Sequence, residues 1–174
     1  MEVTIGQFVD EALATVWDNL RKATIDLTQD QLAWKPSSSA NSIGYTLWHV
    51  GRVEDNFIQR FILRGDEVWA AKGWQDKFGY ETRGIGTGFT TDETEQVPIV
   101  PADTLWSYLN EVRASTLGYM KDLDLGTLNH KPREDRFPEW SIQTILRQLI
   151  AHSNQHLGEI NYIRGLMGLE GSLG

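Results

Sequence analysis

Two histidines, His152 and His156, lie one helical turn apart in the segment H-S-N-Q-H near the end of the chain. Because residues four apart share one face of a helix, both imidazoles can bind the same divalent cation. His49 is the natural third ligand, since it lies beside the apolar positions Leu47 and Val50 of an earlier helical pattern. Imidazole nitrogen suits zinc, nickel, copper and iron, and a set of three leaves coordination positions open for chemistry.

The same spacing also fits histidines that are hydrogen-bonded in or near a metal-free helical core, because a buried imidazole needs polar partners. On spacing alone, both interpretations stand. His130 lies in an irregular link before Pro132 and is expected to be solvated. Zinc proteases of the His-Glu type carry a glutamate base directly after the first histidine, where this chain has Ser153, so peptide hydrolysis by that mechanism is disfavoured.

Three polar residues accompany the histidines at helical spacing and are the candidate catalytic residues. Glu159 follows His156 by three positions, so it is a candidate ligand, base or hydrogen-bond partner of an imidazole, with an exposed carboxylate as the alternative. Tyr45 and Arg52 lie four residues before and three after His49. Both are candidates for bordering the same cavity, Arg52 as a clamp for an anionic substrate, although a surface arginine is the default interpretation.

Four amphipathic helices are expected to position these side chains. Apolar residues recur every three or four positions over about 4–23, 42–64, 103–121 and 141–167. The predicted N-caps are Asn41 or Ser42, Asp103 and Ser141, and Gly168 is placed to end the last helix. Strand-like alternation is scarce, so we predict an all-α protein in which residues 1–174 form a single four-helix bundle.

Two connections break the helical period. The shorter one contains a possible capping box over Thr28 to Gln31 and is expected to hold at most a short helical turn. The longer one runs from Gly65 to Pro101, and its aromatic side chains predict a packed crossover that shapes the substrate pocket over residues 69–97. Such a long crossover can run the full length of a bundle, so the second and third helices need not be antiparallel. No Lys-Ser or Lys-Thr pair accompanies its glycines, so the segment does not match a phosphate-binding loop.

Composition narrows the classes of partner. The chain has 16 Lys and Arg against 24 Asp and Glu, a formal net charge of −8, which opposes attachment to nucleic acid or anionic lipid. No apolar stretch approaches the length of a membrane span, and the first 20 residues lack the basic start and apolar centre of a signal peptide, so a cytoplasmic protein is expected. Because the chain has no cysteine, any thiol chemistry must use a thiol brought by a ligand.

Three segments together resemble a known family: L-A-W-K-P (residues 32–36), N-S-I-G-Y-T-L-W-H-V-G-R-V-E (41–54) and H-S-N-Q-H-L-G-E-I-N-Y-I-R-G (152–165). They are similar to the DinB-like superfamily of YfiT-type four-helix metalloproteins, whose relatives include thiol-dependent transferases and a mycothiol-dependent isomerase. The likeness covers nearly the whole chain. It implies that His49, His152 and His156 bind a divalent metal such as nickel, zinc or iron, that a long crossover follows the second helix, and that the protein is a homodimer.

The histidine set and the resemblance lead to two main hypotheses. In the first, the protein is a metal-dependent enzyme that activates a low-molecular-weight thiol, or water, for transfer to a small electrophilic substrate, as a thiol S-transferase would. In the second, the same histidines hold an ion without turnover, in a stress-response or interaction protein. A metal-free bundle with core histidines is the third interpretation.

Overall fold

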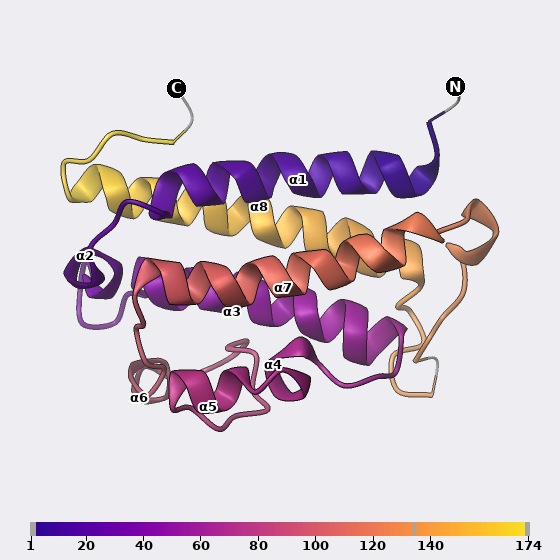
Figure 1. The fold of residues 1–174 in the computed structure, drawn as a ribbon, viewed down its shortest axis with the longest axis horizontal. Helices are drawn as coiled ribbons and strands as arrows, with labels where there is room; N and C mark the ends of the chain where they lie inside the picture. The colour runs from indigo at the N-terminus through magenta and orange to yellow at the C-terminus, as the bar shows by residue number, and fades with distance from the viewer. Residues whose placement is uncertain (1–2, 134, 173–174) are drawn as a thin grey trace.

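The computed structural model describes residues 3–133 and 135–172 of the 174-residue chain. All regular secondary structure in those ranges is helical, as the periodicity predicts. Four long segments form the bundle (Figure 1): α1 (Ile5–Thr24), α3 (Ile43–Asp55) with its π-helical continuation (Asn56–Ile62), α7 (Ala102–Lys121) and α8 (Ile142–Leu166). The described chain is therefore an all-α bundle.

The helix directions follow from the crossover. α1 and α8 run one way, whereas α3 and α7 both run the other way (Figure 1). α3 packs against α7 and α8, and α1 packs against the same two helices. The crossover returns the chain to the start of α3 before α7 begins, so these consecutive long helices are parallel. As a result, α3 is antiparallel to α8, which brings the early part of α3 beside the later part of α8.

Helix ends agree with most of the predicted caps. The side chains of Ser42 and Ser141 accept hydrogen bonds from the backbone N–H group of the third residue of α3 and of α8, respectively. The capping box at Thr28 starts the short helix α2 (Gln29–Ala33). Gly168, with φ of 75°, follows the last turn of α8, where a left-handed residue is favoured.

The predicted cap of α7 is wrong. Pro101 is the N-cap residue and Asp103 lies inside the first turn. The fixed φ of proline suits a helix entry, and the carboxylate in the first turn interacts favourably with the positive end of the helix dipole. The helix therefore starts earlier than the side-chain capping pattern indicates.

The crossover is packed, as its aromatic residues predict. It contains three short helices, α4 (Val68–Ala71), α5 (Trp74–Phe78) and α6 (Thr91–Glu95). The rings of Trp69, Trp74 and Phe78 surround Tyr108 of α7, with ring centroids 5.2–6.1 Å apart. Edge and tilted contacts of this kind fasten the crossover to the bundle.

Helix α3 is buried along its entire length, because α2, α7, α8 and the crossover surround it. An amphipathic helix with one apolar face was predicted, yet its charged residues Arg52, Glu54 and Asp55 are also inside. Buried charges need partners, so this helix must carry internal polar networks.

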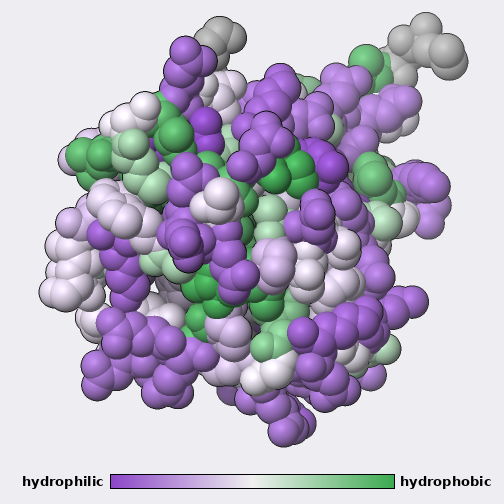
Figure 2. Space-filling view, turned by 60° about the vertical axis from the view of Figure 1, so that its left-hand side comes forward, coloured by the Kyte–Doolittle hydropathy of each residue, from purple (hydrophilic) through white to green (hydrophobic). Residues whose placement is uncertain are grey.

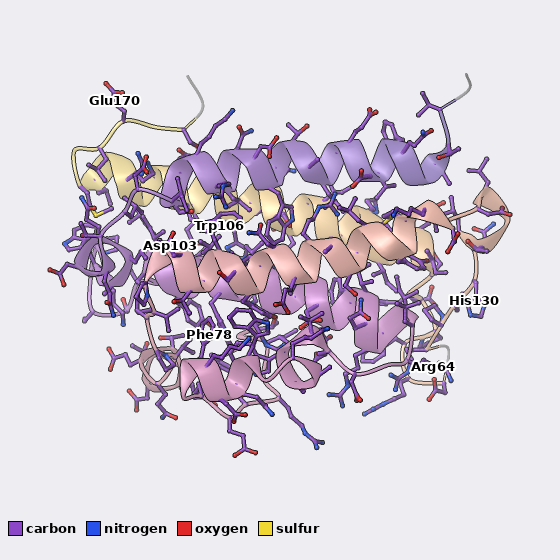
Figure 3. The ribbon with its side chains drawn as sticks, in the orientation of Figure 1. Arg64, Phe78, Asp103, Trp106, His130 and Glu170 are labelled. Carbon is purple, nitrogen blue, oxygen red and sulfur yellow. The ribbon has the colours of Figure 1, made fainter. Side chains whose placement is uncertain are left out.

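Side chains at the periphery differ from those at the helix contacts. Figure 3 shows Trp106 between α1 and α7, where its indole N–H donates to Thr24, while Asp103 and Glu170 lie toward the outside. His130 is exposed, as predicted. Figure 2 shows one face on which hydrophilic side chains predominate and hydrophobic ones occur in smaller groups. No helix in the described ranges combines the length and apolar content needed to cross a membrane.

Candidate metal centre

The three predicted ligands meet between α3 and α8. Their candidate ligand atoms all lie within 4.8 Å of one another. The Nε2 atom of His152 is 3.0 Å from Nε2 of His49 and 3.1 Å from Nε2 of His156. The antiparallel packing of α3 on α8 thus brings His49 to the helical pair that spacing alone places on one face.

The opposite ring nitrogens of two histidines are anchored. Nδ1 of His49 donates to the backbone carbonyl of Ile85 at 2.5 Å, and Nδ1 of His156 donates to the Glu159 carboxylate at 2.7 Å. A nitrogen that donates to such an oxygen carries the proton, so the Nε2 atoms of both rings present lone pairs. Partners of this kind orient imidazoles for metal binding.

Burial keeps His49 and His152 neutral. It lowers the pKa of His49 to about 4, against the opposing effect of the Ile85 carbonyl. Burial, together with the neighbouring His49 and His156, lowers the pKa of His152 to about 3. A neutral imidazole is the form that binds a metal ion, so at neutral pH protons do not compete for these two rings.

This donor set fits a divalent cation. The Nε2 atom of His152 faces the Nε2 lone pairs of both His49 and His156. It carries at most one proton and can donate it to only one of them, so in at least one of the two contacts a lone pair faces another lone pair. Within the described residues, the buried Nδ1 atom of His152 has no hydrogen-bond partner. Nitrogens that share one cation at about 2.0–2.1 Å, at near right angles, lie about 3 Å apart. The three histidines could therefore hold a metal ion, with His49, His152 and His156 as ligands.

A turn of the crossover covers His49. Gly86 accepts a 2.8 Å hydrogen bond from the hydroxyl of Tyr45, and the preceding carbonyl, of Ile85, holds His49. Gly86 has φ of 90°, and a Cβ atom there would lie 2.8 Å from His49 Nδ1 and 2.9 Å from the Tyr45 hydroxyl. Only glycine fits this close approach without moving the ligand.

Two of the three candidate catalytic residues adjoin the histidines. The ring of Tyr45 stacks parallel to His49, with centroids 6.2 Å apart, and burial raises its pKa to about 12. The hydrogen bond with His156 is the main cause of the lowered pKa of Glu159, which also lies 3.5 Å from the hydroxyl of Thr46. Glu159 is therefore a hydrogen-bond partner of a candidate ligand, one of its predicted roles, and is only partly exposed.

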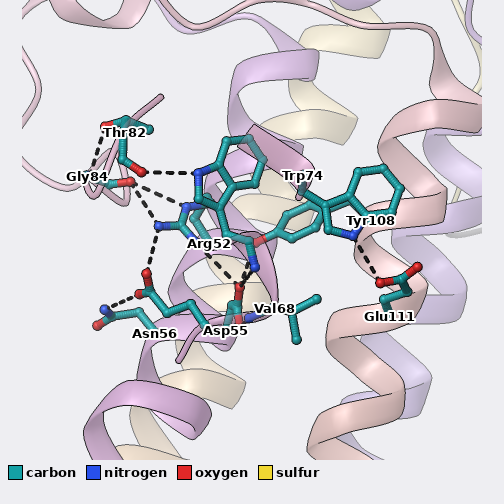
Figure 4. Close-up of polar contacts among 11 residues, drawn as sticks. Arg52, Asp55, Asn56, Val68, Trp74, Thr82, Gly84, Tyr108 and Glu111 are labelled. Atoms are coloured by element: carbon teal, nitrogen blue, oxygen red, sulfur yellow. Dashed lines mark hydrogen bonds and ion pairs between the residues drawn. The ribbon is translucent and has the colours of Figure 1, made fainter. Parts of the chain in front are cut away.

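Arg52 requires a correction, because neither its predicted clamp role nor its default surface position agrees with the structure. Its side chain is fully buried and points into a polar network (Figure 4). The guanidinium contacts Asp55 at 3.4 Å and Glu67 at 3.2 Å, and it donates to the Gly84 carbonyl. With these acceptors the arginine ties the crossover to α3, and it is not available to a substrate.

Sequence reasoning missed the backbone groups of the site. The carbonyls of Ile85 and Gly86 hold His49 and Tyr45, but a carbonyl group is common to every residue and leaves no mark in a sequence pattern. The glycine spacing of the crossover was the available signal. It indicates where the chain can approach closely, without indicating what it approaches.

Comparisons with known proteins agree with this architecture. The family model described as the DinB superfamily matches residues 12–160. A crystal structure described as the conserved protein of locus from Enterococcus faecalis superimposes with a TM-score of 0.84 and 20% sequence identity, over 96% of this chain and 99% of that one. At this identity the likeness shows the fold alone. No curated protein matches the sequence significantly.

Proposed function

This chain belongs to the DinB superfamily, and from the three imidazoles that converge in it we propose a divalent-metal-dependent enzyme that transfers a low-molecular-weight thiol to a small electrophilic substrate. The single observation that carries the proposal is the convergence of three Nε2 atoms, with that of His152 lying 3.0 Å from that of His49 and 3.1 Å from that of His156. Nickel, zinc and iron are the proposed metals, because all three accept imidazole ligands.

A divalent cation held by His49, His152 and His156 would lower the pKa of a thiol or water that binds beside them. In the proposed reaction the sulfur of the thiolate forms a bond to an electrophilic carbon. With an alkyl halide, the halide departs with the electron pair of the carbon–halogen bond and the thiol proton passes to solvent. With an epoxide, a ring C–O bond breaks and its oxygen takes up a proton; with an activated alkene, the C=C π bond breaks and the adjacent carbon takes up a proton. Atoms and charges balance without an oxidant or a reductant.

The residues around the histidines favour a thiol over water. The hydroxyl of Tyr45 stays protonated at neutral pH, given a pKa of about 12, and it already donates a hydrogen bond to the Gly86 carbonyl. The carboxylate of Glu159 already accepts a hydrogen bond from His156. With no free general base beside the histidines in the described part of the chain, a thiol, whose pKa is about 8.5, is a more accessible nucleophile than water. The chain has no cysteine, so this thiol comes from solution.

The test uses untagged protein loaded in turn with nickel, zinc or iron. Each form is incubated with bacillithiol, mycothiol or glutathione and a panel of alkyl halides, epoxides and activated alkenes, and the thioether product is measured by mass spectrometry. We expect metal-dependent product with at least one thiol, and none with the His152→Ala variant. The exposed His130→Ala variant is the matched control and should retain the activity. Failure of every metal, thiol and electrophile combination would contradict the proposal.

A non-catalytic metal-binding protein is the second candidate. The observation in its favour is that both polar neighbours of the cluster, Tyr45 and Glu159, already have hydrogen-bond partners in the protein. Under this alternative the His152→Ala variant loses metal, whereas the wild type binds metal stoichiometrically and gives no product in the assay above.

The assembly and location of the protein are also proposals. From the family resemblance we propose a homodimer, which light scattering of the purified protein would test. We also propose that it works in the cytoplasm on small molecules, and its acidic composition favours action away from nucleic acid and membranes.

A further inference from the structure

A cavity lies away from the histidines, on the outer side of the crossover. Its volume is about 790 Å³, within the range of cavities that hold small organic ligands. The lining contains none of the three histidines. It contains instead the side chains of four arginines, Arg60, Arg64, Arg83 and Arg133. Four acidic residues, Asp66, Glu67, Glu81 and Asp135, line it as well, so the formal charges of the lining balance, whereas the chain as a whole carries −8.

Two of the four acidic residues of the lining have basic partners. Glu67 is compensated from outside the cavity by Arg52, and it also accepts a 2.6 Å hydrogen bond from Asn56. Asp135 lies 3.9 Å from Arg133. Arg60, Arg64 and Arg83 remain in the lining, together with the carboxylates of Asp66 and Glu81.

Two of these arginines are free to meet a ligand. In residues 3–133 and 135–172, no ion pair engages Arg60 or Arg83, and both side chains are exposed. Guanidinium groups form paired hydrogen bonds with the oxygens of carboxylates and phosphates, and these bonds are stronger than those between neutral groups.

The local backbone holds the cavity in shape. Arg64 has φ of 58° and is the one non-glycine residue with positive φ in the described ranges. Glycine is the usual residue at such a helix end, so arginine here accepts a conformational cost. Its guanidinium donates to the Pro132 carbonyl, which fixes the loop that carries Arg133 beside the end of the π-helical segment (Arg64 is labelled in Figure 3). Arg133 in turn lies over the ring of Phe61, 5.7 Å from its centroid.

We propose that this cavity binds a small organic oxyanion, a compound that carries phosphate or carboxylate groups. Arg60 and Arg83 make the direct contacts, and Arg64 and Arg133 line the cavity beside them. The site is separate from the histidine cluster, so the proposal stands whether or not the protein is an enzyme. One structural link joins the two places: Arg52 contacts both Glu67 of the lining and the carbonyl of Gly84, one residue before the carbonyl that holds His49.

The test is isothermal titration calorimetry on the full chain freed of metal, so that anions cannot bind to a cation. The probes are pyrophosphate for the phosphorylated class, citrate for the carboxylated class and glycerol as a neutral control. We expect pyrophosphate or citrate to bind and glycerol not to bind. Affinity should fall as sodium chloride increases, because partly exposed charges are screened.

The paired variant Arg60→Gln with Arg83→Gln should weaken binding at least about tenfold, since each lost guanidinium removes charge-assisted hydrogen bonds. The control pair Arg147→Gln with Lys121→Gln makes the same change in net charge at exposed positions outside this lining. Circular dichroism checks that both pairs fold. Binding of pyrophosphate alone or citrate alone assigns the ligand class. No binding of either anion, or equal weakening by both pairs, would overturn the proposal.

Discussion

Two polar clusters lie one turn apart on α3, and they balance their polar groups in opposite ways. Around Arg52, positive and negative groups alternate: its guanidinium contacts two carboxylates and a carbonyl, and Asp55 also accepts from the backbone N–H groups of Val68 and Trp69. Around His49, three ring nitrogens of the same kind face one another. The first cluster satisfies itself within the fold. In the second cluster the ring nitrogens have no positively charged group of the described chain beside them, and a bound metal ion could be that group.

This difference separates an architectural network from a binding site. Both clusters are buried and both include residues with shifted pKa values, so neither burial nor a pKa shift identifies the site by itself. The chemical kinds of the groups that face one another are the decisive criterion. Removing a group from the Arg52 network should therefore cost stability, and removing a histidine should cost metal.

The largest expected effect is the loss of metal from the His152→Ala variant. His152 lies between the other two histidines, so its removal leaves them with neither the central ligand nor its geometry. We expect stoichiometric metal in the wild type and in the exposed His130→Ala control, and almost none in His152→Ala. Elemental analysis of untagged protein measures this. Equal metal content in all three proteins would contradict the comparison.

Next in size is the effect of Asp55→Asn on stability. The amide would place a donor against the N–H groups of Val68 or Trp69 and leave Arg52 with less compensation. We expect the free energy of unfolding to fall by about 3–5 kcal/mol, as when one partner of a buried ion pair is removed. Urea denaturation measures it, with exposed Asp66→Asn as a control within about 0.5 kcal/mol of wild type. If folded Asp55→Asn protein lost its metal, the two clusters would not be separable.

A smaller effect is expected when Gly86 is replaced by alanine. The new Cβ would press on His49 Nδ1, so we expect metal affinity to fall about 10- to 100-fold, the range for lost support of a ligand. Gly88→Ala is a matched control, because Gly88 also has positive φ, 76°, but a Cβ there has no atom within 4 Å. Competition with a fluorescent chelator measures both affinities. Equal losses would assign the effect to backbone strain alone.

The smallest expected effect is in the pH dependence of stability. His49 has a pKa of about 4 in the folded protein and about 6.5 when unfolded, so between these values the unfolded chain binds more protons. Its contribution therefore makes stability fall as pH decreases through this window. Asp55 acts in the opposite direction, because burial raises its pKa to about 6.

Comparison of the metal-free wild type with His49→Gln isolates the histidine, since the effect of Asp55 is common to both proteins. From pH 6.5 to 5 we expect the wild type to lose about 1–2 kcal/mol more than His49→Gln. Urea denaturation at several pH values measures the difference. An equal loss in the two proteins would mean that His49 titrates normally in the fold.

Much of the bundle could be predicted from local signals. Apolar spacing located the long helices, and Ser42 and Ser141 located two helix starts, because caps and amphipathic faces are decided within a few residues of sequence. The pair His152 and His156 was visible for the same reason. The direction of α3 against α8 is not a local property, and it follows only from the path of the crossover.

Other features depend on partners far along the chain. Arg52 was interpreted as a surface or substrate-facing residue, because its burial depends on Glu67, fifteen residues later, and on a carbonyl of the crossover. The π-helical continuation of α3 has the same apolar residues as an ordinary helix, so periodicity did not distinguish it. Asp103 was predicted as a cap from its residue type, although the preceding proline already fixes the helix entry.

Three successive backbone carbonyls of the crossover, those of Gly84, Ile85 and Gly86, accept hydrogen bonds from Arg52, His49 and Tyr45, respectively. Main-chain oxygens are insensitive to which side chains are attached to them. Substitutions at Ile85 should consequently leave these three bonds in place, whereas inserting or deleting one residue before Gly84 would shift every one of them. Chain length between the short helices, more than residue identity, is what a redesign of this loop would have to preserve.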